Sequence, residues 1–188
     1  ICLVSLLTVS LTNCASQLER IRKQNTPEGQ GGKRVVDLSR LYFSQIVDGS
    51  EVTVEEHMET YELNHMVLMF GSRGCSKCLD KSKELRDLYI PSHDLFLKTP
   101  DFQLMGISTD PKESRAQVLR YTLKNRFDFM KWQDPHGEVL LRELVPKGES
   151  LGVPFTVLLK KDGTVLWHIN NKKKVDVATV IAKISTSI

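Results

Sequence analysis

The sequence predicts an α/β fold in which helices flank a central mixed β-sheet. Three observations support this prediction. Apolar stretches of strand length alternate with segments whose apolar residues have helical spacing. The apolar run 66–70 has the pattern of a strand that is buried on both faces of a sheet. Asp48-Gly49 and Asp162-Gly163 each lie between short apolar segments, which is typical of a β-hairpin and adds antiparallel pairing to the sheet.

In chain order, the predicted elements are a hairpin, a strand, a helix, a strand, a helix, a hairpin and a helix. They span residues 47–54, 66–70, 78–89, 102–108, 112–125, 155–169 and 177–184. Ala116, Leu119 and Leu123 are spaced by three and four residues, which predicts the apolar face of the second helix. Asp176 is the predicted N-cap of the last helix.

The composition bounds the class of protein. Hydrophobic residues make up 40% and charged residues 26% of the 188 residues, a balance typical of a globular domain that buries its own core. The net charge of +3 is small, and no stripe of lysine and arginine alternates with aromatic residues, so we expect no nucleic-acid partner. Four cysteines are too few for a disulfide-dense scaffold.

Residues 1–14 have the features of an export signal. The first eleven are apolar or small, a run shorter than the roughly 20 residues of a membrane span but suited to the hydrophobic part of a signal peptide. The segment from Leu11 to Cys14 resembles the bacterial lipoprotein processing box, in which the cysteine becomes the lipidated N-terminus, although Asn13 departs from the usual Gly or Ala. Another export signal or anchor and a folded first strand are the alternatives.

The export signal predicts a periplasmic protein of the cell envelope, anchored to the membrane through Cys14. Residues 15–40 are expected to form a flexible tether, because 24–32 is polar and glycine-rich with nothing to bury. The folded domain is then expected to span 41–188.

Cys75 and Cys78 are the candidate catalytic residues, because they lie where the buried strand gives way to a helix. At a helix N-terminus, unpaired N–H groups and the helix dipole would stabilise the Cys75 thiolate. Lys77 adds positive charge nearby and would tune the pKa of that thiol downward. Cys78 lies one helical turn further on, close enough to resolve a mixed disulfide. A C-x-x-C motif in this context is typical of redox chemistry.

Other interpretations of the cysteine pair are weaker. A structural disulfide with two residues between its cysteines closes too small a loop to stabilise the chain much. Zinc prefers four ligands, and the five histidines form no second pair at ligand spacing. We therefore expect neither a metal nor another cofactor. If residues 1–13 are cleaved and Cys14 is lipidated, the pair supplies the only thiols in an oxidising compartment.

These motifs together resemble the thioredoxin superfamily, and within it the TlpA/redoxin-type exported thiol–disulfide oxidoreductases. The segments that carry the resemblance are the hairpin 47–53, Cys75-x-x-Cys78, residues 107–111 and Gly152-Val153-Pro154 with the Asp-Gly hairpin that follows. The resemblance covers about 41–185. It implies a thioredoxin-like fold with an N-terminal β-hairpin extension, and an enzyme that exchanges electrons with protein thiols or disulfides and with an upstream redox partner.

The resemblance also assigns residues to the substrate site. In this family the proline of Gly-Val-Pro is cis and faces the cysteine pair, which implies a cis Pro154. A cis proline has no N–H to offer, so the backbone of Val153 is expected to pair with an extended substrate peptide beside the disulfide.

The sequence departs from the family pattern at two positions. The family usually has Trp before the first cysteine, where this chain has Gly74, and thioredoxins bury an Asp beneath the second cysteine, where this chain has Met69. Glu62 is the nearest acid in sequence that could replace that Asp. These departures leave open a non-catalytic thioredoxin-like binding module.

Two other classes that share the fold fit less well. SCO-like copper chaperones hold copper with C-x-x-x-C and a distant His, and soft thiolates suit Cu(I). This chain has C-x-x-C instead, and Gly-Val-Pro stands in the region where that His is expected. Peroxiredoxins need a proline at the position of Leu68.

Overall fold

The computed structural model describes residues 34–97, 102–129, 131–134, 136 and 138–170. Within these residues the strands form one mixed sheet in the order β1-β8-β7-β4-β5-β6-β2-β3. The strands are β1 (Arg34–Val35), β2 (Tyr42–Gln45), β3 (Glu51–Thr53), β4 (His65–Gly71), β5 (Phe102–Ser108), β6 (Trp132–Gln133), β7 (Phe155–Lys160) and β8 (Thr164–Ile169). The helices are the 3₁₀ helix η1 (Leu38–Arg40), α2 (Val54–Thr60), α3 (Ser76–Leu97), α4 (Arg115–Asn125) and α5 (Val139–Leu144).

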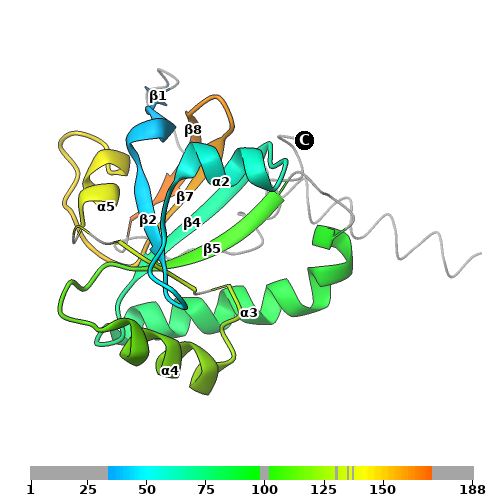
Figure 1. Cartoon of the computed structure of the whole chain (residues 1–188), viewed down its shortest axis with the longest axis vertical. Coiled ribbons are helices and arrows are strands. Elements are labelled where there is room, and N and C mark those ends of the chain that lie inside the picture. Colours follow the sequence, from blue (N-terminus) through cyan, green and yellow to red (C-terminus); the bar gives the residue numbers. More distant parts are fainter. Residues whose placement is uncertain (1–33, 98–101, 130, 135, 137, 171–188) are drawn as a thin grey trace, which may run out of the picture. The chain divides into compact units, whose positions relative to one another are not determined.

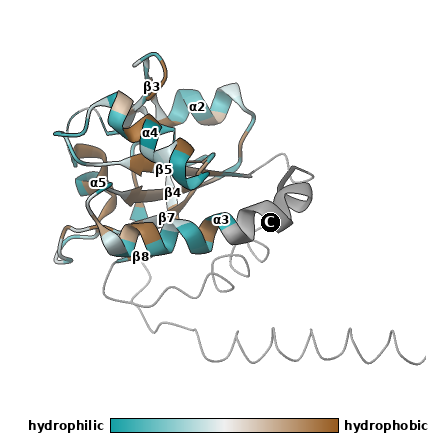
Figure 2. Ribbon diagram, turned by 90° about the horizontal axis from the view of Figure 1, so that it is seen from below, coloured by the Kyte–Doolittle hydropathy of each residue, from teal (hydrophilic) through white to brown (hydrophobic). Residues whose placement is uncertain are grey.

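Strand β4 lies at the centre of the sheet, and every one of its residues is buried. It pairs in parallel with β5 and antiparallel with β7, so the predicted mixed sheet and the predicted central strand are both confirmed. Figure 1 shows α3 and α4 on one side of β4 and β5, with α2 and α5 on the other side. Hydrophobic residues are concentrated in β4 and β5, between helices of mixed hydropathy such as α3 (Figure 2).

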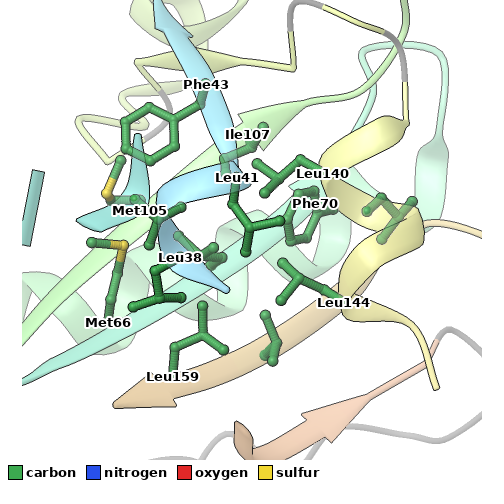
Figure 3. Close-up of a cluster of buried hydrophobic side chains, with 14 of the residues drawn as sticks. Leu38, Leu41, Phe43, Met66, Phe70, Met105, Ile107, Leu140, Leu144 and Leu159 are labelled. Carbon is green, nitrogen blue, oxygen red and sulfur yellow. The ribbon is translucent and has the colours of Figure 1, made fainter. Parts of the chain in front are cut away.

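The main hydrophobic core lies between the sheet and the layer formed by η1, α2 and α5. Even-numbered residues of β4 face this layer, and Met66 and Phe70 are fully buried in it. Figure 3 shows these side chains packed among Leu38, Leu41, Phe43, Met105, Ile107, Leu140, Leu144 and Leu159. Odd-numbered residues face α3, where the Oγ of Ser82 donates a hydrogen bond to the Sδ of Met69 at 3.7 Å. The two layers hold β4 rigidly where it leads into the cysteine segment.

Helices α2 and α4 begin at side chains that accept hydrogen bonds from N–H groups of the first turn. Thr53 and Glu56 form a capping box at α2, and Ser114 and Gln117 form another at α4. At α5, Asp134 accepts a hydrogen bond from the backbone N–H of Leu140 at 3.0 Å. No described helix is both long enough and apolar enough to cross a membrane.

Both predicted hairpins are present, as β2–β3 and β7–β8, although the first strand of the first hairpin lies at 42–45 rather than at 47. The predicted apolar face of α4 is wrong. Leu123 is 67% exposed, whereas Val118 and Thr122 are buried. Tyr121 packs edge-on against Phe127 at 5.8 Å, so the helix turns the 118–121–122 stripe inward.

The predicted boundary between the tether and the domain needs a correction. Residues 34–40, expected in the tether, are folded: β1 pairs with β8, and Leu38 is buried in the core. The Nη1 of Arg34 also donates a hydrogen bond to the carbonyl of Leu144 at 2.8 Å. The tether was predicted from the polar, glycine-rich composition of 24–32. Residues 34–40 do not share that composition, and their apolar side chains extend the core. Cys14, the rest of the predicted tether and the predicted helix 177–184 lie outside the described residues.

His57 on α2 links folding stability to pH. Its side chain is 3% exposed, its Nε2 lies 2.6 Å from Gln103 Oε1, and its ring meets those of Phe43, Tyr61 and Trp132. Burial lowers the pKa of His57 below its usual 6.5, and the Gln103 contact opposes this only in part. Below about pH 6.5 the unfolded chain takes up a proton that folded His57 resists, so stability is lost as pH falls through the window beneath 6.5.

We therefore expect His57→Gln to reduce the loss of unfolding free energy between about pH 7.5 and about pH 5.5. Urea unfolding of both proteins at the two pH values measures the difference. Equal losses in the variant and the parent would show that His57 does not carry this pH dependence.

Candidate active site

The cysteine pair lies where β4 ends and α3 begins. A disulfide joins Cys75 and Cys78, whose Cα atoms are 5.2 Å apart. The two residues differ in exposure, because Cys75 is partly exposed whereas Cys78 is 1% exposed. A partner disulfide can therefore reach Cys75 first, with Cys78 behind it.

Glycine at position 71 lets the strand approach the buried cysteine closely. A Cβ atom placed on Gly71 would lie 3.3 Å from the Cβ of Cys78, 3.6 Å from its Sγ and 3.5 Å from the Cε of Met69. The Cε of Met69 and the Cys78 side chain therefore both border Gly71, and Met69 stands where thioredoxins bury an Asp. Glu62, the acid considered from sequence, is exposed and does not supply that carboxylate.

The first turn of α3 directs its backbone donors at Cys75. The N–H of Cys78 donates a hydrogen bond to the Sγ of Cys75 at 3.0 Å, and the N–H of Leu79 donates to the Cys75 carbonyl at 3.1 Å. Helix N-terminal N–H groups and the helix dipole favour a thiolate at this place. The geometry therefore matches the local arrangement expected for a reactive first cysteine.

The loop before β7 reaches the same sulfur. The Val153–Pro154 peptide bond is cis, as the family resemblance implied. The carbonyl oxygen of Val153 lies 3.9 Å from the Sγ of Cys75. Residues that are about 80 positions apart in sequence thus meet at one sulfur atom, and any peptide bound beside Cys75 would adjoin this loop.

Lys77 and Gly74 are both exposed on the surface around the disulfide. A Cβ on Gly74 would meet no heavy atom within 4 Å, so the position where the family usually has Trp opens onto unoccupied space. Within the described residues, no group of three or more His, Cys, Asp or Glu side chains is arranged to hold a metal ion.

Glu113 is a buried acid next to the site that the sequence patterns did not single out. Glu113 is 6% exposed, and its Oε1 accepts a hydrogen bond from the backbone N–H of Arg73 at 2.8 Å. Its Oε2 accepts another from the Oγ of Ser108 at 2.8 Å. The available signal was its place between a strand end and the helix cap Ser114, since the carboxyl ends of neighbouring parallel strands lie at the same sheet edge.

Asp134 is a second buried acid at this edge, at 2% exposed. Burial raises the pKa of its carboxyl above the usual 3.8, and hydrogen bonds from the backbone N–H groups of His136 and Leu140 oppose that rise. One of its oxygens accepts the Leu140 N–H in the first turn of α5, which joins that helix to the chain just after β6.

No protein-family model matches the chain, and no curated protein matches it. Solved structures do. A thiol–disulfide oxidoreductase from Bacteroides fragilis is 18% identical, with a TM-score of 0.60 over 82% of this chain and 100% of that one. The thioredoxin domain of a thiol–disulfide oxidoreductase from Bacteroides vulgatus is 15% identical, with a TM-score of 0.57 over 81% of this chain and 99% of that one.

A secreted disulfide oxidoreductase from Mycobacterium tuberculosis, described as homologous to Escherichia coli DsbE, is 16% identical, with a TM-score of 0.54. The match covers 77% of this chain and 94% of that one. The chain therefore has a thioredoxin-like fold, as the resemblance implied, and the three solved structures are described as thiol–disulfide or disulfide oxidoreductases or as a domain of one.

Proposed function

We propose that the protein is a thiol–disulfide oxidoreductase that exchanges two electrons with protein substrates through Cys75 and Cys78. The observation that carries the proposal is the asymmetry of the pair. Cys75 is partly exposed and its Sγ accepts the N–H of Cys78 in the first turn of α3, whereas Cys78 itself is buried one turn behind it. This arrangement separates an attacking thiol from a resolving thiol.

In the reducing direction, the Cys75 thiolate attacks one sulfur of a substrate disulfide. A mixed disulfide forms, and the other substrate sulfur leaves as a thiolate that takes up a proton. The Cys78 thiol then loses its proton, and its sulfur attacks the Sγ of Cys75. The second substrate thiol is released, the Cys75–Cys78 disulfide forms, and the substrate has gained two electrons. An upstream dithiol partner restores the reduced pair by the same exchange, and the oxidising direction is the reverse.

Val153 and Pro154 are proposed to contact the substrate backbone. The carbonyl of Val153 lies 3.9 Å from the sulfur that would carry the mixed disulfide, so a substrate chain joined to Cys75 has this loop as its neighbour. Lys77 is proposed to favour the Cys75 thiolate. Because Lys77 is exposed, its contribution is expected to be small and to weaken with salt.

We further propose that the protein is exported and held at the periplasmic face of a membrane by a lipid on Cys14. The support is the apolar segment before Cys14 and the similarity of the fold to an oxidoreductase described as secreted. Disulfides form and persist in oxidising compartments, so protein disulfides that the Cys75–Cys78 pair could exchange with are found there.

The test is reduction of insulin by dithiothreitol with and without the protein, beside a Cu(I) titration of the reduced protein. We expect catalytic amounts of protein to accelerate the precipitation of reduced insulin. Tight copper binding without acceleration would instead support a copper chaperone. If the protein neither accelerates insulin reduction nor binds copper, a non-catalytic binding module is supported.

A further inference from the structure

The segment 72–74 joins β4 to Cys75. Arg73 and Gly74 are exposed, and a Cβ on Gly74 would touch nothing within 4 Å. The N–H of Cys75 donates to the carbonyl of Ser72 at 3.2 Å, which closes a turn within the chain from Ser72 to Cys75 but does not itself join that turn to another element. A contact from another element can therefore fix how this turn lies.

Glu113 supplies such a contact from the loop between β5 and α4. Its Oε1 accepts the backbone N–H of Arg73 at 2.8 Å and lies 3.7 Å from the Nε of the same residue. The Arg73 side chain is 47% exposed, whereas that of Glu113 is 4% exposed, so the carboxylate is the buried member of the pair. The same carboxylate therefore holds both the backbone and the side chain of Arg73, two residues before Cys75.

Glu113 is itself held firmly. Its Oε2 accepts the Ser108 hydroxyl at 2.8 Å, its own N–H donates to the Asp110 carbonyl at 3.1 Å, and its carbonyl accepts from the Nε2 of Gln133 at 2.8 Å. These partners lie on β5, on the following loop and on β6. The carboxylate is thus fixed to the sheet, and it can transmit that rigidity to the cysteine segment.

We propose that Glu113 is a positioning residue for the exchange reaction, because its carboxylate fixes the segment that places Cys75 at the N-terminus of α3. The inference rests on the proposed function. If Arg73 is released, Cys75 can move away from the Cys78 N–H, and its thiolate loses that donor. A carboxylate near a thiol also acts through its charge, which disfavours the thiolate. The two roles have opposite consequences, so they can be separated.

Two conservative variants separate them. Glu113→Gln keeps the length and an oxygen that accepts the Arg73 N–H, and its amide can donate to the Ser108 oxygen, but the charge is removed. Glu113→Asp keeps the charge but is one methylene shorter, so it no longer reaches Arg73. The readout is the rate at which iodoacetamide alkylates Cys75 in the reduced protein as a function of pH, with peptide mass spectrometry to identify the modified cysteine.

For a positioning role, we expect Glu113→Asp to slow alkylation near pH 7 by about three- to tenfold and to raise the apparent pKa of Cys75. Glu113→Gln should stay within about twofold of the parent, since one neutral hydrogen bond replaces a charged one. Thermal unfolding of both variants checks that the fold is retained. Asp110→Asn, which removes a charge from the same loop without touching Arg73, is the matched control.

Faster alkylation of Cys75 in Glu113→Gln, together with a parental alkylation rate in Glu113→Asp, would overturn the proposal in favour of a charge effect. Parental rates in both variants would also overturn it. If Glu113→Asp does not fold, Glu113→Ala takes its place, because it removes both the acceptor for the Arg73 N–H and the charge. Slower alkylation in Glu113→Ala beside a parental rate in Glu113→Gln supports positioning, whereas a parental or faster rate in Glu113→Ala overturns it. Alkylation needs no protein substrate, so the result can be read even if the parent fails to reduce insulin, which would contradict the proposed function alone.

Discussion

Replacing Cys75 with serine should abolish disulfide reduction, whereas replacing Cys78 with serine should accumulate mixed disulfides with substrate. The reason is the order in which the two sulfurs act. Without the partly exposed Cys75 no nucleophile meets the substrate, and insulin reduction should fall to the uncatalysed rate. Without the buried Cys78 the first step still occurs, but the mixed disulfide is not resolved. Non-reducing gels of each variant incubated with oxidised insulin measure the trapped complex.

Ser76→Ala is the control for this pair of variants. Ser76 lies between the cysteines, is exposed, and its replacement leaves both thiols in place. Its activity should match that of the parent. Complexes trapped by Cys75→Ser but not by Cys78→Ser would reverse the assigned roles.

Phe70→Ala should destabilise the fold by about 3–5 kcal/mol, because it removes a large side chain from a core that cannot fully collapse around the cavity. Phe70 is 0% exposed on the central strand, one residue before Gly71, and its ring centroid lies 6.1 Å from that of Phe155. Urea unfolding measures the free-energy difference. Leu123→Ala, at a side chain 67% exposed on α4, should change the same quantity by less than about 0.5 kcal/mol.

If Phe70→Ala costs less than about 1 kcal/mol, the packing described around β4 is not what stabilises the domain. A large loss in Leu123→Ala would mean that the exposed face of α4 is covered in solution.

The predictions that succeeded from sequence alone rest on local signals. The run 66–70 is apolar throughout and short, which is typical of a strand buried on both faces, and β4 has that position. Asp162-Gly163 defines a tight turn, and Gly163 has a φ of +80°, which a residue with a side chain rarely adopts. The cis Val153–Pro154 bond followed from family resemblance rather than from any physical pattern in the sequence.

The elements that were missed are short or depend on distant partners. Strands β1 and β6 have two residues each, and their pairing with β8, β5 and β2 defines them. Helix α2 has only seven residues, too few to show periodicity, although Thr53 and Glu56 have the capping-box spacing that marks its start. The prediction of the buried face of α4 was wrong because the spacing of residues shows which of them share a face but not which face packs against the sheet.

The contact between Glu113 and Arg73 could not be predicted from sequence for a similar reason, although the place of Glu113 after a strand end was visible. Arg73 is 40 residues away from Glu113, and the contact exists because β4 and β5 are parallel neighbours with their carboxyl ends at one edge. The approach of Val153 to Cys75 depends likewise on the antiparallel pairing of β7 with β4. Charge or hydropathy patterns carry no information about such juxtapositions.

The most direct test of the central claim is the reduction potential of the Cys75–Cys78 couple, measured in a glutathione or dithiothreitol series with alkylation of the free thiols. A pair that cycles in catalysis should show one two-electron transition at a potential above about −300 mV, because structural disulfides typically lie below that value. A potential well below about −300 mV, or a disulfide that the series cannot reduce, would contradict the account and leave the pair a structural crosslink.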